Sequence, residues 1–176
     1  DALAGIAHVV VPGRLQRIDE GQDYLAIVDY AHKPAAVAAV IATLRSEIKG
    51  RLCVVLGAGG DRDASKRAIM GREAARGSDL FIVTDDNPRS EDPAVIRAAV
   101  EAGAYELPTE ERGEVRNIGD RAAAIRAAIA WAEPGDAVLV AGKGHETGQN
   151  VNGVIHHFDD REEVRAALQE RRTGSL

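Results

Sequence analysis

Short apolar runs alternate with amphipathic segments along most of the chain, and this alternation constrains the fold more than any other feature. Five runs have the length and composition of buried strands, namely YLAIVDY, RLCVVLG, DLFIVTD, the weaker EVRNIG, and AVLVAG. The segments between them carry apolar residues at helical spacing, as in KPAAVAAVIATLRSEI. GVIHHF, which has more polar alternation, is expected to add an edge strand. The pattern predicts an α/β fold with a mostly parallel sheet of about six strands and helices on both faces.

Composition narrows the possible functions. The 176 residues suffice for one domain with a hydrophobic core. The net charge is −6 and no Lys/Arg run is present, so we expect no nucleic-acid-binding surface. No apolar run approaches the roughly 18 residues that span a bilayer, and no signal peptide is visible, so the cytoplasm is the expected location. Cys53 is the single cysteine, which excludes an internal disulfide. The chain begins with Asp1 and not with Met, and we expect it to be a domain of a longer protein.

Polar loops follow four of the predicted strands. They are DYAHKP, GAGGDRD, DDNPR and AGKGHETG, whereas the connections that lead into the strands are plainer. In sheets of this kind ligands bind beyond the carboxyl ends of the strands. The sequence therefore predicts a binding site at that edge.

The loop GAGGDRDASK is rich in glycine but fits neither common phosphate-binding motif. It lacks the Gly-Lys-Ser/Thr of a Walker loop and the spacing of a dinucleotide fingerprint. One interpretation is a turn that lets the backbone approach a ligand, with Arg62 projecting into a crevice. The alternative is a plain strand-to-helix turn, in which Asp63 caps the helix and Arg62 pairs with a neighbouring acid.

The loop DDNPR has side chains suited to binding an amino acid. The planar guanidinium of Arg89 can form a two-pronged bond to a carboxylate. Asn87 can both donate and accept, and Pro88 stiffens the turn between them. The alternative is that Asp85 or Asp86 pairs with Arg89 in a surface ion pair worth about 0–1 kcal/mol.

The remaining two loops, AGKGHETG and DYAHKP, add carboxylates, imidazoles and a glycine whose backbone can approach a ligand closely. His145 has no second histidine or cysteine pair at metal-ligand spacing, so zinc is not supported. Glu146 can hold an ammonium group, and Gly142 can bring its carbonyl close to a ligand. Asp29 suits a ribose hydroxyl and His32 suits a nucleotide, unless both serve to cap the following helix.

Five motifs together carry a resemblance. PGR, VDYAHKP, GAGGDRDASKR, TDDNPRSEDP and VAGKGHE occur in the order seen in the Mur ligases of bacterial cell-wall synthesis. Roughly residues 11–168 resemble the C-terminal, Rossmann-like domain of the members that add meso-diaminopimelate to UDP-N-acetylmuramoyl-L-alanyl-D-glutamate. The resemblance implies that residues 1–18 connect to a missing central domain and that residues 19–176 form the domain that binds the acceptor amino acid.

The resemblance also implies roles for individual residues. The residues it assigns to meso-diaminopimelate are Arg62, Asp86, Asn87, Pro88, Arg89, Gly142 and Glu146. It assigns Arg14, Asp29 and His32 to ATP. It assigns no catalytic residue and no metal ligand to this chain, because ATP and magnesium are held mainly by the central domain, with its Gly-Lys-Thr loop and carbamylated lysine. The other implied partners are the UDP-N-acetylmuramoyl-dipeptide and the missing N-terminal and central domains, with no nucleic acid and no membrane.

The implied activity is that of an ATP-dependent amide ligase that works through an acyl-phosphate. This domain would position the diaminopimelate amine and exclude water, so the fragment alone is expected to be inactive. Two alternatives stay open. The acceptor could be another amino acid such as L-lysine, whose ligases depart from the pattern at the arginine of DDNPR, or the chain could be a non-catalytic nucleotide-binding module.

Overall fold

A six-stranded sheet forms the centre of the protein in the computed structural model, which describes residues 11–176. The strand order is β1-β2-β6-β3-β4-β5. The bounds are Gln16–Arg17 for β1, Leu25–Asp29 for β2, Leu52–Leu56 for β3, Leu80–Val83 for β4, Glu114–Asn117 for β5 and Ala137–Ala141 for β6. All neighbours pair in parallel except β1, which is antiparallel to β2.

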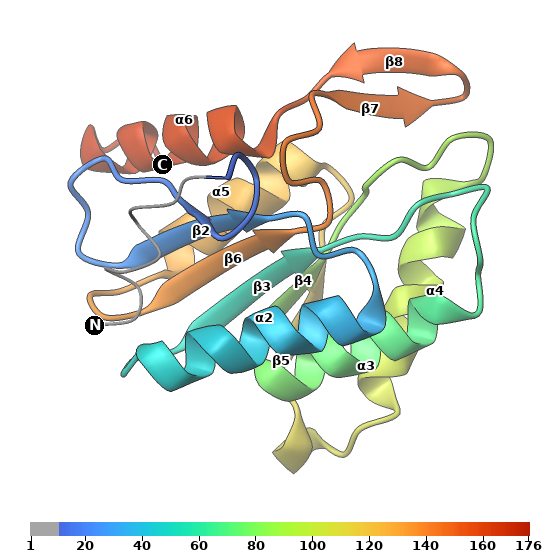
Figure 1. Ribbon diagram of the computed structural model, residues 1–176, viewed down its shortest axis with the longest axis horizontal. Helices are drawn as coiled ribbons and strands as arrows, with labels where there is room; N and C mark the ends of the chain where they lie inside the picture. The colour runs from blue at the N-terminus through green and yellow to red at the C-terminus, as the bar shows by residue number, and fades with distance from the viewer. Residues whose placement is uncertain (1–10) are drawn as a thin grey trace.

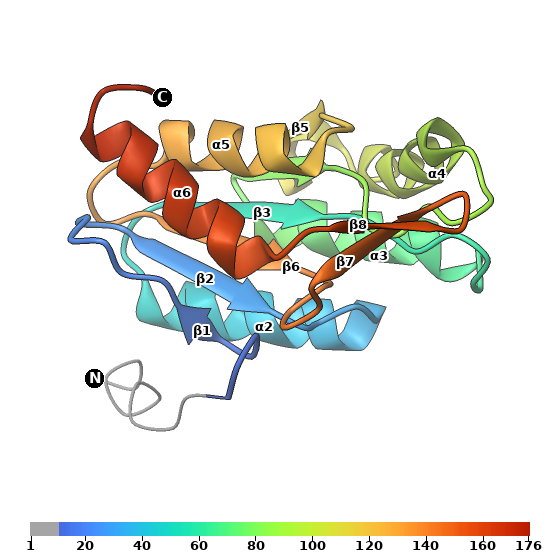
Figure 2. The same ribbon diagram turned by 90° about the horizontal axis from the view of Figure 1, so that it is seen from above.

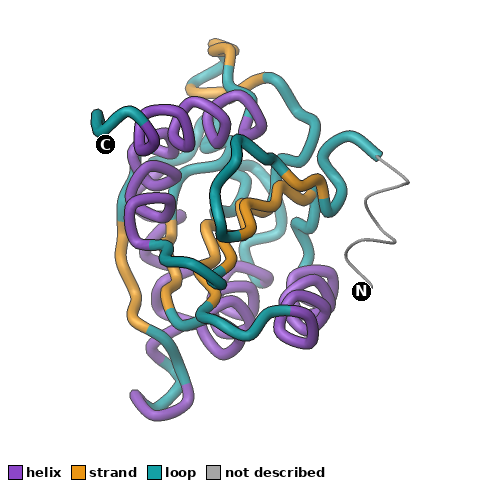
Figure 3. Tube along the Cα trace, turned by 90° about the vertical axis from the view of Figure 1, so that its left-hand side faces the viewer, coloured by secondary structure: helices purple, strands orange, loops and turns teal. Residues whose placement is uncertain are grey.

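Helices cover both faces of this sheet (Figure 1). Helices α2 (Pro34–Glu47), α3 (Lys66–Gly77) and α4 (Pro93–Tyr105) pack on one face, and α5 (Arg121–Trp131) and α6 (Asp160–Arg172) on the other. Figure 2 shows the sheet between α2 on one side and α5 and α6 on the other, and Figure 3 shows the same layers from the side. A short 3-10 helix, Thr109–Glu111, precedes β5. The predicted α/β fold, with a mostly parallel sheet of six strands between helices, is confirmed.

Small aliphatic side chains fill the two layers between sheet and helices. Every residue of β3 and β6 is buried, as expected for central parallel strands. Each Val, Leu or Ile buried in this way stabilises the fold by about 1.5–3 kcal/mol. Cys53 is fully buried in β3, where burial raises the pKa of its thiol and leaves it to pack as an apolar side chain.

The helices that leave the carboxyl edge start at defined residues, which fixes the lengths of the loops before them. Pro34 and Pro93 stand in the first turns of α2 and α4, where a missing backbone N–H is harmless. The carboxylate of Asp92 accepts the N–H of Ala94 at 2.9 Å, and so caps α4. The loops that lead into α2 and α4 therefore end at defined residues.

The prediction that GVIHHF adds an edge strand to the sheet is wrong. Residues Val154–His157 form β8, which pairs with β7 (Gly148–Val151) in a separate two-stranded hairpin. Asn152 and Gly153 connect the two strands, and both have positive φ, +51° and +80°. This turn is the kind that closes two-residue hairpins, so β8 finds a local partner and leaves the sheet.

The edge position is taken by β1, which lies within the predicted connector. Residues 1–10 of that connector lie outside the described residues. Residues 16–17 pair with β2, and Ile18 is only 1% exposed. In residues 11–176 no helix combines the length and apolar character needed to cross a membrane.

Candidate functional site

The loops that follow β2, β3, β4 and β6 converge on one cavity of about 430 Å³ at the carboxyl edge of the sheet. Six of the seven residues predicted to contact an acceptor amino acid line it. They are Arg62, Asp86, Asn87, Arg89, Gly142 and Glu146. Segments far apart in the sequence are thus brought together by the parallel topology, because successive parallel strands end at the same edge.

A second cavity of about 530 Å³ adjoins the first. It is lined by the three residues predicted to meet a nucleotide, Arg14, Asp29 and His32, and by part of α2. Tyr30 and His32 line both cavities. The two predicted groups of residues therefore form two neighbouring pockets that share one wall.

Arg89 reaches the first cavity from a strained backbone. Its φ is +50°, which is uncommon for a residue other than glycine. Hydrogen bonds to the hairpin hold this conformation: the N–H of Arg89 donates to the carbonyl of Asn150 at 2.9 Å, and the N–H of Asn152 donates to the carbonyl of Arg89 at 2.8 Å. The guanidinium Nη1 donates to the carbonyl of Gly60 at 2.8 Å. Strain held in place by its surroundings is characteristic of functional residues.

The alternative that an adjacent aspartate neutralises Arg89 is wrong. Asp85 pairs with Arg97, with 2.5 Å between Oδ1 and Nη1. Asp86 faces Lys143, whose Nζ lies 3.5 Å from Oδ1. Within residues 11–176, Arg89 makes no ion pair, so its remaining donors are available to a carboxylate.

Arg62 is exposed, and its Nη1 donates to the carbonyl of its neighbour Asp61 at 2.9 Å. In the described part of the chain it has no carboxylate within ion-pair distance, so the alternative of an acid partner is not what the structure shows. The loop itself is fastened to the next one. The Oγ of Ser90 donates to Asp61 at 2.6 Å, and buried Arg67 donates to Glu91 at 2.6 Å. This hydrogen bond from Arg67 lowers the pKa of Glu91.

Asn87 sits between the cavity and the hairpin. Its Oδ1 accepts the N–H of Asn150 at 2.8 Å and lies 3.4 Å from the Nζ of Lys143. Its Nδ2 lies 3.4 Å from Oε2 of Glu146. Sequence reasoning missed Lys143, although the signal was available: it is a lysine between two glycines directly after a strand that is apolar at every position.

Gly142 and Pro88 act through the backbone. Gly142 has a φ of +112°, and a Cβ there would come within 3.0 Å of Oδ2 of Asp86, so a side chain would be strained and would press on the acid. Pro88 does not line the cavity. Its carbonyl passes so close to Gly60 that a Cβ on that glycine would lie 1.9 Å away. Pro88 therefore sets the spacing of two loops and is the one predicted acceptor contact that the structure keeps away from the cavity.

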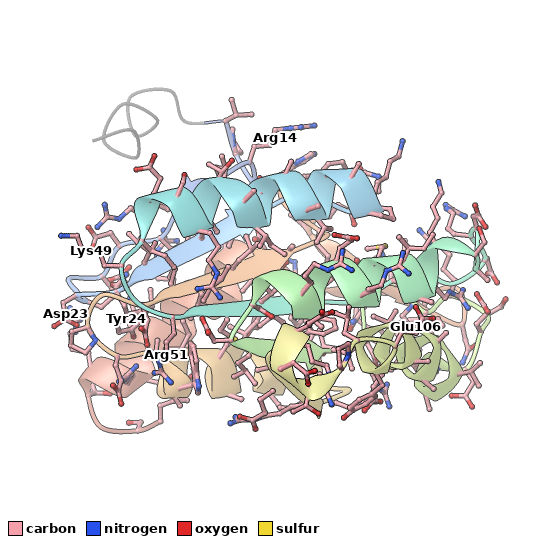
Figure 4. The ribbon with its side chains drawn as sticks, turned by 90° about the horizontal axis from the view of Figure 1, so that it is seen from below. Arg14, Asp23, Tyr24, Lys49, Arg51 and Glu106 are labelled. Carbon is pink, nitrogen blue, oxygen red and sulfur yellow. The ribbon has the colours of Figure 1, made fainter. Side chains whose placement is uncertain are left out.

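Asp29 does not cap α2, and that alternative is wrong. Its two oxygens accept backbone N–H groups from Leu15 at 2.7 Å and from Ala31 at 2.8 Å, and α2 starts without a side-chain cap. His32 is exposed, and its Nδ1 lies 3.0 Å from the carbonyl of Tyr30. The guanidinium of Arg14 stands 5.4 Å from the centre of the Tyr30 ring, beside α2 (Figure 4).

The charges of the first cavity suit a ligand that carries both signs. Arg62 and Arg89 bring guanidinium groups, and Asp86 and Glu146 bring carboxylates. Within residues 11–176, no cluster of three or more His, Cys, Asp or Glu side chains is placed to hold a metal ion. The charged groups that line the cavity can recognise a ligand by hydrogen bonds and ion pairs.

Fold and site together define a Rossmann-like domain with a cavity at the carboxyl edge of its sheet that is lined by side chains of both charges. Residues 13–144 match the family described as "Mur ligase, glutamate ligase domain". The chain belongs to the Mur ligase family, of which it is a C-terminal domain.

Relatives agree with this assignment. The chain is 66% identical over 174 residues to the UDP-N-acetylmuramoyl-L-alanyl-D-glutamate–2,6-diaminopimelate ligase of Corynebacterium glutamicum, covering 98% of this chain and 34% of that protein. A solved structure of a ligase with the same name is 41% identical with a TM-score of 0.84, over 93% of this chain and 33% of the other. The structure of E. coli FolC in complex with ADP, at 24% identity and a TM-score of 0.56, covers 97% of this chain and 34% of the other and shares the fold. The chain thus spans about a third of the length of the relatives it matches.

Proposed function

We propose that this chain is the acceptor-binding domain of a full-length ligase that uses ATP to add meso-diaminopimelate to UDP-N-acetylmuramoyl-L-alanyl-D-glutamate. Residues 19–176 form the binding domain together with the edge strand β1, and the chain before β1 leads to it from a central domain. The observation that carries the proposal is the guanidinium of Arg89, which has no ion-pair partner in residues 11–176 and lines the same cavity as Asp86 and Glu146. The names of the relatives supply the identity of the acceptor.

The acceptor fits the charges of the cavity. Diaminopimelate has a carboxylate and an ammonium group at each end of its chain. A fixed guanidinium rewards the distal carboxylate, and a lysine acceptor, which has no such carboxylate, would leave Arg89 unpaired. Asp86 and Glu146 are suited to the ammonium group. The charge of Arg89 would then select meso-diaminopimelate over L-lysine.

ATP and magnesium belong to the proposed reaction but mainly to another part of the protein. Arg14, Asp29 and His32 line a pocket that adjoins the acceptor cavity, which supports a role in meeting the nucleotide when the domains close. We place magnesium on the central domain. Because ATP is its co-substrate, the enzyme is expected to work in the cytoplasm.

The proposed chemistry starts with transfer of the γ-phosphoryl group of ATP to the γ-carboxylate of D-glutamate. The diaminopimelate amine attacks the resulting acyl-phosphate, and the tetrahedral intermediate releases phosphate to leave the amide. The residues of this domain hold the amine in position and exclude water on closure. The 176-residue chain alone is therefore expected to bind without turnover.

The test uses the full-length ligase with Arg89→Ala. We expect KM for meso-diaminopimelate to rise by about tenfold or more, because a desolvated charge pair is lost. Arg76→Ala, an exposed arginine at the end of α3, serves as the matched control and should leave KM unchanged. An enzyme that prefers L-lysine, or an Arg89→Ala variant with an unchanged KM for meso-diaminopimelate, would contradict the proposal.

A further inference from the structure

Lys143 is a fully buried cation behind the wall of the acceptor cavity. Its side chain is 0% exposed. It lies between Gly142 and Gly144, two residues after the end of β6. Burying an ammonium group is costly unless hydrogen bonds and opposite charges compensate it. The groups that surround the Lys143 ammonium therefore show which parts of the site the buried charge holds in place.

The partners of the Lys143 ammonium group belong to the loops after β4 and β6, which line the cavity, or to the β7–β8 hairpin. Its Nζ donates to the carbonyl of Gly148 at 2.7 Å and to Oδ1 of Asn87 at 3.4 Å. The carboxylates of Asp86 and Glu146 lie 3.5 Å and 3.6 Å from the same atom. Two carboxylates around one ammonium leave one negative charge, which a cationic group of a ligand can balance.

Two contacts together decide which way the amide of Asn87 faces, one from the backbone of Asn150 at 2.8 Å and one from Lys143 at 3.4 Å. Oδ1 lies between two donors, the Nζ of Lys143 and the backbone N–H of Asn150. An amide nitrogen in that place would set donor against donor, so the oxygen must point inward. The Nδ2 group then faces the cavity, where it lies 3.4 Å from Glu146.

The hairpin fixes the same loop from its other side. The Nε2 of Gln149 donates to the carbonyl of Asp86 at 2.8 Å, and the backbone of Arg89 pairs with Asn150 and Asn152. Lys143 joins this arrangement through the carbonyl of Gly148. The loop between β4 and α4 is thus held between the buried ammonium group of Lys143 and strand β7.

We infer that Lys143 is a positioning residue for acceptor recognition: it orients the amide of Asn87 so that Asn87 offers a hydrogen-bond donor, and not an acceptor, to the ligand. With Arg89, Asn87 then presents donors to a carboxylate. This inference rests on the proposed function, because the ligand it concerns is the acceptor amino acid.

The first test is a double-mutant cycle in the full-length ligase. Lys143→Met keeps an unbranched apolar side chain one atom shorter than lysine and removes the ammonium group. It should raise KM for meso-diaminopimelate by about tenfold while KM for ATP changes by less than about twofold, since a charge-assisted hydrogen bond is lost. Asn87→Ala should have a similar effect, and the double variant should be little worse than the stronger single variant. Additive effects, or an equal rise in both KM values, would overturn the inference.

Two further variants keep the test decisive if Lys143→Met does not fold. Asn87→Asp retains an oxygen for Lys143 but replaces the donor that faces the cavity with an acceptor. It should weaken meso-diaminopimelate binding at least as much as Asn87→Ala, and a tolerated Asn87→Asp would refute the orientation. Lys49→Met is the matched control, because Lys49 is exposed at the opposite edge of the sheet (Figure 4).

Failure of this inference can be told from failure of the proposed function. Each variant is assayed with meso-diaminopimelate and with L-lysine as acceptor. An unmodified enzyme that does not use meso-diaminopimelate refutes the proposed function. The positioning role alone is refuted if the unmodified enzyme uses meso-diaminopimelate and the Lys143→Met and Asn87→Asp variants have the same KM for it as the Lys49→Met control.

Discussion

Arg89 combines two demands on a single residue, because it must occupy a left-handed backbone conformation and carry a guanidinium. Glycine would satisfy the first demand and an arginine in an extended loop the second. Holding an ordinary residue at a φ of +50° costs about 1–2 kcal/mol. The backbone hydrogen bonds that Arg89 donates to Asn150 and accepts from Asn152 offset that cost. Stability alone does not favour arginine at this position, whereas the proposed recognition of a carboxylate does.

A comparison of two variants at this position separates backbone strain from side-chain function. Arg89→Gly and Arg89→Ala both remove the guanidinium, but only glycine adopts positive φ without strain. We expect the Gly variant to be more stable than the Ala variant by about 1 kcal/mol. Urea unfolding of the 176-residue chain measures the difference. An Ala variant as stable as the Gly variant would show that the backbone is not strained at this position.

The carboxyl edge of the sheet depends on a buried ion pair between two helices. Arg121, at the start of α5, pairs with Asp160, at the start of α6, with 2.7 Å between Nη2 and Oδ2 and both side chains 0% exposed. Arg121 also donates to the carbonyls of Asp85 and Ala141, at 3.1 Å and 3.0 Å. It therefore joins the ends of β4 and β6 to the helices behind them.

Removal of one partner should leave a buried charge without compensation. Asp160→Ala is expected to destabilise the domain by about 3–5 kcal/mol. Glu114→Ala breaks the exposed pair between Glu114 and Arg116 and should cost less than about 1 kcal/mol. Chemical denaturation of the two variants gives the comparison, and equal losses would contradict the importance of the buried pair.

The hairpin is linked to α6 by a contact that depends on pH. His157 of β8 lies 2.8 Å from Glu162, and this hydrogen bond raises the pKa of His157 above its usual 6.5. Because the folded pKa is the higher one, the stabilisation is complete below about pH 6.5 and is lost as pH rises through the folded value. The hairpin should be held more firmly to α6 in acid.

An NMR titration of the His157 ring tests this directly. We expect a midpoint above 6.5 that falls when Glu162 is replaced in Glu162→Gln, because the charged partner is removed. A midpoint that does not respond to the substitution would show that Glu162 is not the cause.

The elements that could be predicted from the sequence are determined by local patterns. Those that could not be predicted depend on turn geometry or on contacts between distant residues. The five parallel strands follow from local apolar runs, and their polar loops meet because parallel strands share an edge. β8 was misplaced because the Asn152-Gly153 turn gave it a local partner. β1 has only two residues, too few for a pattern. Lys143 was missed although it stands between two glycines after an apolar strand, because its burial and its contact with the distant Asn87 are not visible in the local sequence.

At the scale of the whole molecule, both cavities lie at one edge of the sheet. Two adjoining pockets open at one edge of the sheet, and the acceptor pocket joins four loops into a single cavity. The other edge, where Asp23, Tyr24, Lys49 and Arg51 lie, contributes to neither pocket (Figure 4). Under the proposed function, this edge would face the central domain when the acceptor is joined to its partner substrate.

The most direct measurement is a crystal structure of the full-length ligase with meso-diaminopimelate bound. The account predicts one ligand carboxylate within about 3 Å of both the Arg89 guanidinium and Nδ2 of Asn87, with an ammonium group beside Asp86 and Glu146. A ligand bound outside this cavity, or one whose carboxylate lies away from Arg89, would contradict it.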